Sequence, residues 1–341
     1  QDYLRGEWQN LYTNNDLPID AIISPEQEVA NAFHRRIISP GTIDMVELSE
    51  KQLKLIGFKC NNNCHHIGLT IRELSAKFPD YLANLLFIFR GDKKFIVNSS
   101  SKIEKDDLIY MVVETQNLKD VLREFGHKEV QAQKIVIIGG GNIGFSLAEL
   151  IEKNDNGIST ELIEMNKERA EFIASNLNNV TVTNGDGLDN QILDEVNIAE
   201  AGYCLAVTED DEVNVLASLL AKRAGTNQCM ALINNSSYTS LLSNIGIDIT
   251  IDPKLITISK ILEKVRGGGI MSDYSLGDGF GEVIEAMIKK QSPLCNKNLK
   301  ELNLPKSIRI ASILRNNKII IPNSNTVFKE NDDVVFFAET Q

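Results

Sequence analysis

The sequence predicts an α/β fold in which a doubly wound parallel sheet is joined to small α+β lobes, with this arrangement duplicated along the chain. Three observations lead to this prediction. Strand-like and helix-like segments alternate through residues 134–251. A glycine-rich loop follows the first strand of that alternation. A pattern found near residue 20 returns near residue 250.

The alternation contains six short apolar segments of strand length, separated by segments whose apolar residues have helical spacing. Six strands with five intervening helices are the number expected of a doubly wound sheet. We therefore predict strands at 134–138, 160–163, 180–183, 203–207, 229–233 and 247–251, and helices at 145–153, 167–177, 191–195, 210–223 and 237–243.

The glycine-rich loop has the G-x-G-x-x-G spacing of a Rossmann-like dinucleotide-binding fingerprint. Gly139 permits a tight turn, Gly141 lets the backbone approach a pyrophosphate, and Gly144 allows close helix–strand packing. The helix N-terminus adds amide donors and a favourable dipole for an anion. The predicted cofactor-binding residues of the loop are Gly139, Gly140, Gly141, Asn142, Ile143 and Gly144.

Glu164 ends the second strand, 25 residues after Gly139. A carboxylate at this place can accept hydrogen bonds from ribose hydroxyls, and it disfavours a ribose 2′-phosphate. The predicted cofactor is therefore NAD(H) rather than NADP(H). The alternative is a glycine loop that serves packing alone and binds no ligand.

Two further segments are expected at the same crevice, because they follow the third and fourth strands of the sheet. Asn184-Gly185-Asp186 follows the third strand and Thr208-Glu209 follows the fourth. Asp186, Thr208 and Glu209 are therefore added to the predicted cofactor contacts. The alternatives are a turn for the first segment and a helix cap for the second.

The repeat extends over much of the chain. Ile19–Pro25 reappears as Ile247–Pro253, and in both copies a capping residue before proline predicts the start of a helix. Each copy then predicts a β-hairpin, at 85–97 and 308–321, and a last strand that is followed by Glu-Thr-Gln. A separation near 225–228 residues is kept along the repeat, which indicates a duplication.

The duplication predicts domain boundaries. By the repeat register, about 95 residues of the first unit are expected before Gln1. The glycine run at 267–269 follows a helix, so a hinge is predicted there rather than a phosphate loop. We predict the C-terminal remnant of a first Rossmann domain at 1–41, a first small lobe at 42–116, a linker at 117–133, a second, nucleotide-binding Rossmann domain at 134–266, and a second small lobe at 267–341.

Composition disfavours several classes of partner. The formal net charge of −12, from 35 basic and 47 acidic residues, disfavours nucleic acid and direct adhesion to an anionic membrane. No apolar run reaches the roughly 18–20 residues that cross a bilayer, so no membrane insertion is predicted. Five scattered cysteines predict a reducing, cytoplasmic setting rather than a disulfide framework.

Catalytic chemistry is not evident beside the predicted nucleotide site. None of the four histidines lies in 134–266, and that span has no Tyr-x-x-x-Lys spacing, so no catalytic residue is predicted. Cys204 and Cys229 are expected in the core. The most metal-like stretch fits no common zinc motif, so we predict a solvent-facing loop and no metal site there. Its residues are Cys60, Cys64, His65 and His66.

Five motifs in order carry a resemblance to a known family. They are Asp2-Tyr3-Leu4-Arg5, Ala21–Glu26 (AIISPE), Ile138–Gly144, Ala206–Asn214 and Ala221–Gly225 (AKRAG). Together they resemble the TrkA family, the cytosolic regulatory subunits of bacterial Trk potassium uptake systems. The resemblance covers nearly the whole chain. It implies two RCK/KTN units, each with a Rossmann-like RCK N-terminal domain and an RCK C-terminal lobe, and a regulator rather than an enzyme.

The resemblance also implies ligands and partners. Family members bind NAD(H), and adenine nucleotides such as ATP and ADP, in their Rossmann lobes. They form homo-oligomers, as dimers or tetrameric rings, at the inner face of the cell membrane beneath a TrkH/TrkG-like potassium-translocating subunit. Bound nucleotide shifts the arrangement of the lobes and biases the partner's gate. The sequence departs from the family at Leu232-Ile233-Asn234, where an arginine often faces the phosphates; this weakens the expectation of ATP more than that of NAD.

Two enzyme classes are alternatives to a regulator. One is an NAD-dependent oxidoreductase. The other is a methyltransferase, because an acid after the second strand and a Gly-Asp turn after the third also suit S-adenosylmethionine. The duplication argues against both, because a tandem pair suits a symmetric ring better than a single active site.

Overall fold

The computed structural model describes residues 22–77, 83–91, 93–127, 133–154, 157–235, 237, 242, 245–265, 270–276, 280–305 and 307–339. The repeated segment at 19–25 and the predicted helix at 237–243 lie partly outside these residues, and the motif at 2–5 and the glycine run at 267–269 lie wholly outside them. Within the described residues, no helix combines the length and the apolar character needed to cross a bilayer.

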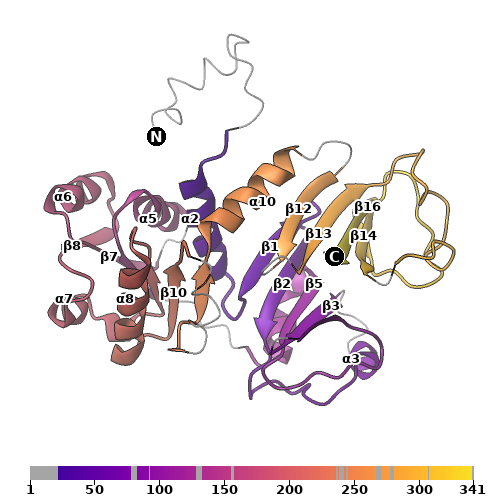
Figure 1. Ribbon diagram of the computed structural model, residues 1–341, viewed down its shortest axis with the longest axis horizontal. Helices are drawn as coiled ribbons and strands as arrows, with labels where there is room; N and C mark the ends of the chain where they lie inside the picture. Colours follow the sequence, from indigo (N-terminus) through magenta and orange to yellow (C-terminus); the bar gives the residue numbers. More distant parts are fainter. Residues whose placement is uncertain are drawn as a thin grey trace, which may run out of the picture.

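A six-stranded parallel sheet forms one end of the molecule, at the left of Figure 1. Its strand order, β11-β10-β9-β6-β7-β8, confirms the predicted doubly wound sheet. All strands are parallel, but the order in which successive strands are added reverses between β6 and β9, and ligands bind such sheets at that switch point. The elements are β6 (Lys134–Ile138), α5 (Asn142–Asn154), β7 (Ser159–Glu164), α6 (Lys167–Asn176), β8 (Val180–Asn184), α7 (Asn190–Glu195), a 3₁₀ turn (Ile198–Glu200), β9 (Tyr203–Ala206), α8 (Asp211–Ala224), β10 (Gln228–Leu232) and β11 (Ile249–Ile251).

Helices cover both faces of this sheet because its strands are apolar on both sides. α7 and α8 pack over a core that includes Val136, while α5 and α6 pack over Ile137 on the opposite face. Cys204 and Cys229 are neighbours in register on β9 and β10, and both are fully buried, as predicted.

Helix α2 (Pro25–Ile37) belongs to the first repeat but packs against α5 of the second repeat's sheet domain (Figure 1). Its buried face carries Val29, Phe33 and Ile37, the apolar residues whose spacing predicts the helix. All three lie in one core cluster with residues of α5 and the parallel sheet. The first copy therefore supplies part of the second copy's hydrophobic core.

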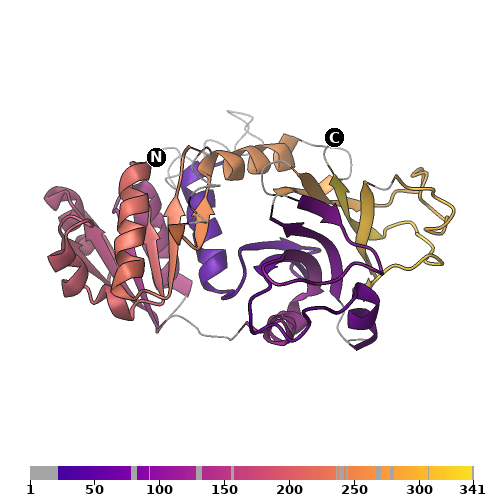
Figure 2. The ribbon, with the colours of Figure 1, turned by 60° about the horizontal axis from the view of Figure 1, so that its bottom comes forward.

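Both crossover helices begin at a proline that follows a capping residue. Ser24 accepts the amide of Gln27 at 3.5 Å, and Asp252 accepts the amide of Lys254 at 2.8 Å. The second of these helices, α10 (Pro253–Val265), lies beside α2 and leads to the second small lobe, as Figure 2 shows.

Two antiparallel sheets form the other end of the molecule and repeat one strand order, β1-β2-β5-β3-β4 and β12-β13-β16-β14-β15, which confirms the duplicated lobes. An ion pair is repeated as well. Arg90 Nε lies 2.7 Å from fully buried Asp107, and Arg315 Nε lies 2.6 Å from fully buried Asp332. The first lobe contains β1 (Asp44–Leu48), β2 (Leu53–Lys59), α3 (Ile71–Lys77), β3 (Ala83–Arg90), β4 (Lys93–Ile96) and β5 (Leu108–Glu114); the second contains β12 (Ile270–Leu276), β13 (Gly281–Met287), β14 (Ile308–Arg315), β15 (Lys318–Ile320) and β16 (Asp333–Glu339).

The segment after β5 packs back onto the first lobe. A 3₁₀ turn at Thr115–Asn117 leads into α4 (Leu118–Glu124), whose three apolar side chains enter the lobe's core. The sequence predicts a linker over 117–133, and this is wrong for the part that forms α4. Apolar residues at helical spacing remove themselves from water by packing on the nearest apolar surface, here the lobe itself.

The predicted solvent-facing loop at 60–66 is only partly exposed, because its cysteines and one of its histidines point inward. Cys60, Cys64 and His66 are buried beneath α4, where the His66 ring lies 5.2 Å from the ring of Phe125, while His65 is exposed. The Cys60 thiol donates a hydrogen bond to Cys64 and lowers the pKa of the Cys64 thiol to about 7. Across the described part of the chain, no group of three or more His, Cys, Asp and Glu side chains is placed to hold a metal ion.

The two small lobes share one hydrophobic core. Phe87 of the first lobe stacks on Phe337 of the second, with ring centroids 4.7 Å apart, and on Tyr110 of its own lobe at 4.6 Å. Phe280 and Val335 of the second lobe belong to the same cluster. The lobes therefore form a pair within one chain.

The contact between the lobes also buries two carboxyl groups of the second lobe. Glu285 accepts the backbone amide of Ser49, which belongs to the first lobe, at 2.5 Å. Burial and the adjacent Glu285 raise the pKa of Asp333 to about 8. A proton held between these two groups therefore contributes to the contact between the lobes at neutral pH.

We expect the thermal stability of the lobe pair to fall as the pH rises from about 5 to 8. The folded state holds the Asp333 proton more tightly than the unfolded chain does. The stability contributed by this proton is therefore complete near the unfolded pKa of 3.8 and is lost as the pH rises to the folded pKa of about 8. The free energy of unfolding should fall by up to roughly 1.4 kcal/mol per pH unit in this window. Asp333→Asn should flatten this slope in melting curves at constant ionic strength. Glu330→Gln, at an exposed acid three residues earlier, is the control; equal slopes for the two variants would contradict the assignment.

Candidate functional site

The glycine-rich loop turns from β6 into α5 at the carboxyl edge of the parallel sheet. Gly139 has a φ of +107°, which favours glycine, and a Cβ there would meet Thr208 at 3.0 Å. A Cβ on Gly144 would lie only 1.9 Å from the carbonyl oxygen of Gly139. The turn and the close approach of the helix to the strand therefore both require glycine.

The middle of the loop is open. Gly141 is exposed, and a Cβ built on it would have no atom within 4 Å. Phe145 donates the first helical bond of α5 to the carbonyl of Gly141, at 2.9 Å. The amides of Asn142 and Ile143 precede that bond and belong to the first turn, where helix amides can donate to an anion.

Glu164 lies at the end of β7, on the same side of the sheet as the loop. Its Oε2 accepts the amide of Gly140 at 2.7 Å, and its Oε1 accepts the amide of Asn166 at 2.7 Å. Each oxygen of a carboxylate can accept more than one hydrogen bond. The carboxylate is thus fixed by two backbone bonds and retains acceptor capacity for hydroxyl groups.

Thr208 lies against the glycine turn and is held from behind by Asn214. Its amide and its hydroxyl donate to Oδ1 of Asn214, at 2.8 and 2.7 Å, while this fully buried asparagine donates to the carbonyl of Leu232. Asp210 caps α8 by accepting an amide of the first turn at 2.9 Å. Asp210 is therefore the residue that caps α8, the role that the sequence offers as the alternative for this segment. Glu209 is exposed at the rim of the site.

Asp186 lies in a turn that follows β8. Its Oδ1 accepts the amide of Leu188 at 2.9 Å, and its carbonyl accepts the amide of Asp189 at 3.0 Å, which is the turn that the sequence offers as the alternative. Asn184 joins this turn to the rest of the site, because its side chain donates to the carbonyl of Glu164 at 2.9 Å. The side chain of Asp186 itself is exposed.

Arg169 is a residue of the site that sequence reasoning does not find. It follows the end of β7 by five residues, and its Nε and Nη2 donate to the carbonyls of Gly140 and Gly141, at 2.7 and 3.3 Å. Its guanidinium lies over the rings of Phe145 and Phe172, 5.5 and 5.0 Å from their centroids. Arg169 therefore braces the loop and places a positive charge beside it. Its only signal in the sequence is a Glu-x₄-Arg spacing.

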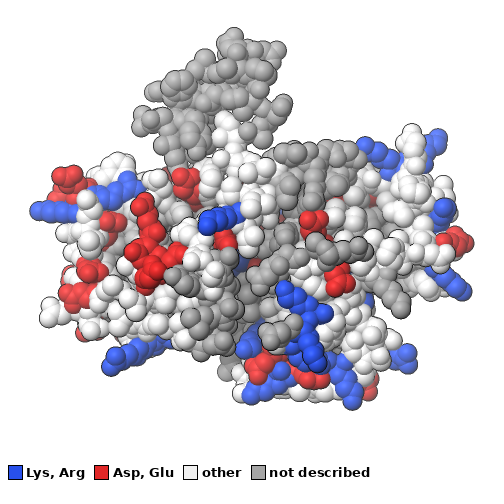
Figure 3. All heavy atoms as spheres, in the orientation of Figure 1, with Lys and Arg blue, Asp and Glu red and all other residues white. Residues whose placement is uncertain are grey.

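The rim around the start of α8 is acidic. Figure 3 shows acidic side chains gathered near this helix, which begins with Asp211-Glu212 and is preceded by Glu209-Asp210. Asp211 is buried and accepts the amides of Asn234 and Asn235, both at 2.8 Å. The negative rim disfavours ligands with extra phosphate groups near it. No histidine occurs in residues 133–265.

The fold and the site define a tandem protein in which a Rossmann domain with a dinucleotide-type glycine loop is joined, through crossover helices, to paired β-rich lobes. The TrkA-N domain model matches residues 135–253, and the TrkA-C domain model matches residues 283–341. The chain belongs to the TrkA family of Trk system potassium uptake proteins.

Relatives cover nearly the whole chain. The Trk system potassium uptake protein TrkA of Azorhizobium caulinodans is 38% identical over 99% of this chain and 74% of its own length. That of Vibrio alginolyticus is 32% identical over 98% of this chain and 73% of its own length. Membership in this family identifies a transport-system regulatory protein and not an enzyme, which removes the oxidoreductase and methyltransferase alternatives.

Solved structures show the same fold. The crystal structure of the GsuK RCK domain has a TM-score of 0.53 at 17% identity and covers 98% of this chain and 70% of that chain. The GsuK channel bound to NAD has a TM-score of 0.51 at 15% identity and covers 93% of this chain and 56% of that chain. The resemblance implied an RCK arrangement, and these structures confirm it.

Proposed function

We propose that this protein senses NAD(H) through its Rossmann domain and regulates a potassium-translocating membrane partner without consuming the nucleotide. The observation that carries the proposal is Glu164, held against the amide of Gly140 beside the open backbone at Gly141. This places an acceptor for hydroxyl groups next to donors for a diphosphate. Such a pair suits a ribose linked to a diphosphate.

The remaining predicted contacts fit one bound dinucleotide. The diphosphate would take amides of the first turn of α5, at Asn142 and Ile143, with Gly141 leaving room for its approach. Thr208 would lie beside the glycine turn, with Glu209 and Asp186 at the rim. When bound, the cofactor supplies a charged, oriented ligand for these groups.

NAD(H) fits this site better than ATP or ADP. The segment Leu232-Ile233-Asn234 carries no cation for additional phosphates, and the rim at Glu209 is acidic. The GsuK channel bound to NAD shares the fold, which supports a dinucleotide in this kind of domain. ATP and ADP are proposed as weaker ligands of the same cleft.

A route from the site to the lobes supports a regulatory role. The site lies at the start of α5, and α2 packs along that helix. In the last turn of α2, Arg36 donates to Asp44 of the first lobe at 2.8 Å. Tyr274 of the second lobe donates to the same carboxylate at 3.3 Å. A shift of α5 on binding would therefore reach both lobes, provided that the nucleotide binds one arrangement more tightly than another.

The partner and the assembly follow from the family. We propose a TrkH/TrkG-like potassium-translocating subunit, with this protein at the inner face of the cell membrane as a homo-oligomer, either a dimer or a tetrameric ring. In this proposal the working parts are the segment at 1–41, the lobes at 42–116 and 267–341, and the sensing domain at 134–266.

A titration of the chain with NADH, NAD, ATP and S-adenosylmethionine tests the proposal. We expect NADH to bind most tightly, without turnover, and Gly141→Asp to weaken it at least about 100-fold, because a carboxylate would face the diphosphate. Asn190→Asp, which adds the same charge at an exposed position of α7, should bind like the wild type. Selective binding of S-adenosylmethionine, or equal NADH binding by the two variants, would reject the site. Co-purification with a polytopic membrane protein tests the partner separately.

A further inference from the structure

Two thiols lie side by side in the turn that follows β2, outside the nucleotide site. Cys60 directly follows this strand, and Cys64 closes the turn by donating its amide to the carbonyl of Asn61 at 3.1 Å. Both cysteines belong to the core cluster of the first lobe, and both are free thiols. The Cys60 thiol donates a hydrogen bond to Cys64. The two sulfur atoms are therefore already in contact, as the formation of a disulfide requires.

The surroundings of the pair favour the thiolate of one cysteine. The hydrogen bond from Cys60 is the main cause that lowers the pKa of Cys64 to about 7, against the opposing effect of burial. The amides of His66 and Ile67 donate to the Cys64 sulfur and act in the same direction. The bond between the two thiols raises the pKa of Cys60, as do burial and the nearby Asp107. Cys64 is therefore the nucleophile of the pair at neutral pH, and Cys60 holds its proton.

The second lobe forms the same turn without thiols. The amide of Cys60 donates to the residue before β5 at 2.7 Å, and the amide of Ile288 donates to the residue before β16 at 2.8 Å. The turn that follows is closed at Cys64 in the first lobe, at 3.1 Å, and at Ser292 in the second lobe, at 2.9 Å. Isoleucine and serine thus satisfy the fold at these two places. The thiol pair is a property of the first lobe and not a requirement of the repeated fold.

The pair lies closer to solvent than the other hydrogen-bonded pair of cysteines in the described chain. Cys64 is 6% exposed, and its neighbours Asn63 and His65 are exposed, so the pair lies beneath a surface turn. Cys204 and Cys229, by contrast, are fully buried in the sheet domain. The hydrogen bond to Cys229 and burial raise the pKa of Cys204 well above its ordinary value. Thiols in such apolar surroundings are inert, so oxidants should act on the first-lobe pair.

Both ends of the turn touch the residues that follow α4. Gly126 has a φ of +83°, and a Cβ there would lie 2.4 Å from the carbonyl group of Asn63 and 2.8 Å from the amide nitrogen of Cys64. The two backbones therefore pack with no space between them. His127 donates through Nε2 to the carbonyl of Lys59 at 3.0 Å. A bond between the two sulfur atoms would move the turn and would disturb both of these contacts.

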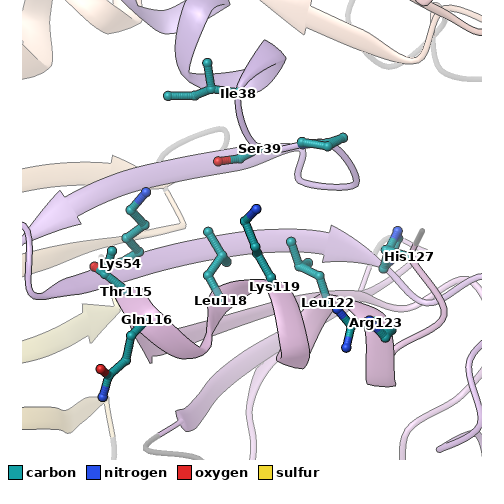
Figure 4. Close-up of a pocket in the computed structure, with 11 residues that line it drawn as sticks. Ile38, Ser39, Lys54, Thr115, Gln116, Leu118, Lys119, Leu122, Arg123 and His127 are labelled. Atoms are coloured by element: carbon teal, nitrogen blue, oxygen red, sulfur yellow. The ribbon is translucent and has the colours of Figure 1, made fainter. Parts of the chain in front are cut away.

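The helix has room to move on its other side. Figure 4 shows α4 and His127 on one side of a cavity of about 340 Å³, with the turn at Ile38 and Ser39 on the other. The ring of His127 also touches Gly41, where a Cβ would lie 2.9 Å from it. Gly41 follows α2, which packs on α5 of the sheet domain. A displacement of α4 would therefore be felt at the end of the crossover helix.

We propose that Cys60 and Cys64 form a reversible disulfide when the protein meets a peroxide, and that this bond loosens α4 from the first lobe. The Cys64 thiolate attacks one peroxide oxygen, and the O–O bond breaks. The second oxygen leaves as hydroxide and takes up the proton that Cys64 released, while Cys64 becomes a sulfenic acid. The Cys60 sulfur then attacks the Cys64 sulfur, and the S–O bond breaks to release water with the Cys60 proton.

The reaction is balanced and reversible. Two thiols and one peroxide give one disulfide and two waters, so the sulfur atoms are oxidised by the two electrons that reduce the peroxide. A small dithiol restores both thiols by exchange through a mixed disulfide. The switch is independent of the proposed NAD(H) site.

Peroxide titration, followed by alkylation of free thiols and mass analysis of peptides, tests the proposal. Cleavage after Lys59 and Arg72 places both cysteines in one peptide, 60–72. We expect this peptide to escape alkylation and to lose about 2 Da, and dithiothreitol to reverse the change. Peroxide should act on it at concentrations at least about tenfold below those that modify Cys204 or Cys229. Amide hydrogen exchange in α4 should become at least about tenfold faster in the oxidised protein.

Two serine variants are the controls. Cys64→Ser carries the residue that the second lobe has at this place, and peroxide should change neither its 60–72 peptide by loss of hydrogen nor its exchange in α4. Equal exchange and equal melting of this variant and the wild type under reducing conditions show that it is folded. Cys295→Ser, at a half-buried cysteine of the second lobe, should respond like the wild type.

The other outcomes overturn the proposal. They are a 60–72 peptide that gains oxygen without forming the disulfide, oxidation of Cys204 or Cys229 at equal peroxide concentrations, unchanged exchange of α4 in the oxidised wild type, or accelerated exchange in peroxide-treated Cys64→Ser. NADH binding enters none of these measurements, so failure of the sensing proposal would leave the result standing.

Discussion

Gly144→Ala is expected to abolish NADH binding and to destabilise the Rossmann domain. The new Cβ would lie 1.9 Å from the carbonyl oxygen of Gly139, a contact that folded proteins do not contain, so either the loop or α5 must move. Overpacking of this severity costs about 3 kcal/mol in the free energy of unfolding. We expect a loss of NADH affinity of at least about 100-fold, measured by fluorescence titration beside thermal unfolding.

Gly141→Ala is the matched control within the same loop. A Cβ at Gly141 meets no atom within 4 Å, so the free energy of unfolding should change by less than about 0.5 kcal/mol. NADH affinity should nevertheless fall, because the new methyl group occupies space that the diphosphate needs. Wild-type binding by Gly144→Ala would show that the ligand does not depend on this loop.

Phe33→Ala is expected to destabilise the second Rossmann domain, although Phe33 belongs to the first repeat. The side chain is fully buried in the core formed by α2, α5 and the parallel sheet. Truncation of a buried phenylalanine to alanine costs about 3–5 kcal/mol. The affected unfolding transition should be the one that NADH shifts to higher temperature, because that transition belongs to the domain that binds it.

The control for Phe33→Ala is Ile258→Ala on the other crossover helix. Ile258 is 52% exposed, so its truncation should change the free energy of unfolding by less than about 0.5 kcal/mol. If Phe33→Ala left the NADH-sensitive transition in place, α2 would not complete that domain's core in solution.

The sheet domain is predictable because its signals are local. Each strand is a short apolar run between turn residues, and β6 is found at 134–138 as predicted. Strand order follows from the alternation with helices, and with it the proximity of Glu164 to the glycine loop. The lobes are predictable for a different reason: the same order of strand and turn signals occurs in both copies, so each copy supports the assignment of the other.

Other features of the fold depend on which surfaces pack against each other, and the spacing of apolar residues along the sequence does not give this information. The apolar stripe of α2 shows that one face is buried but not that the second repeat's α5 covers it. The polar residues around Cys60 and His66 suggest a solvated loop. Cys60 and His66 are nevertheless buried, because α4 packs over them. Arg169 is missed because its role arises from the rotamer that lays it across the loop.

The pairing of the two lobes inside one chain has a consequence for how they diverge. In a symmetric homodimer every contact residue occurs twice, so a change on one side is forced on the other. Here Glu285 stands in one copy where Gly57 stands at the same register of the other, so the two halves bring different groups to the contact. Because the two lobes are covalently linked, each can acquire its own substitutions at the contact. The linkage also keeps the lobes together at any protein concentration.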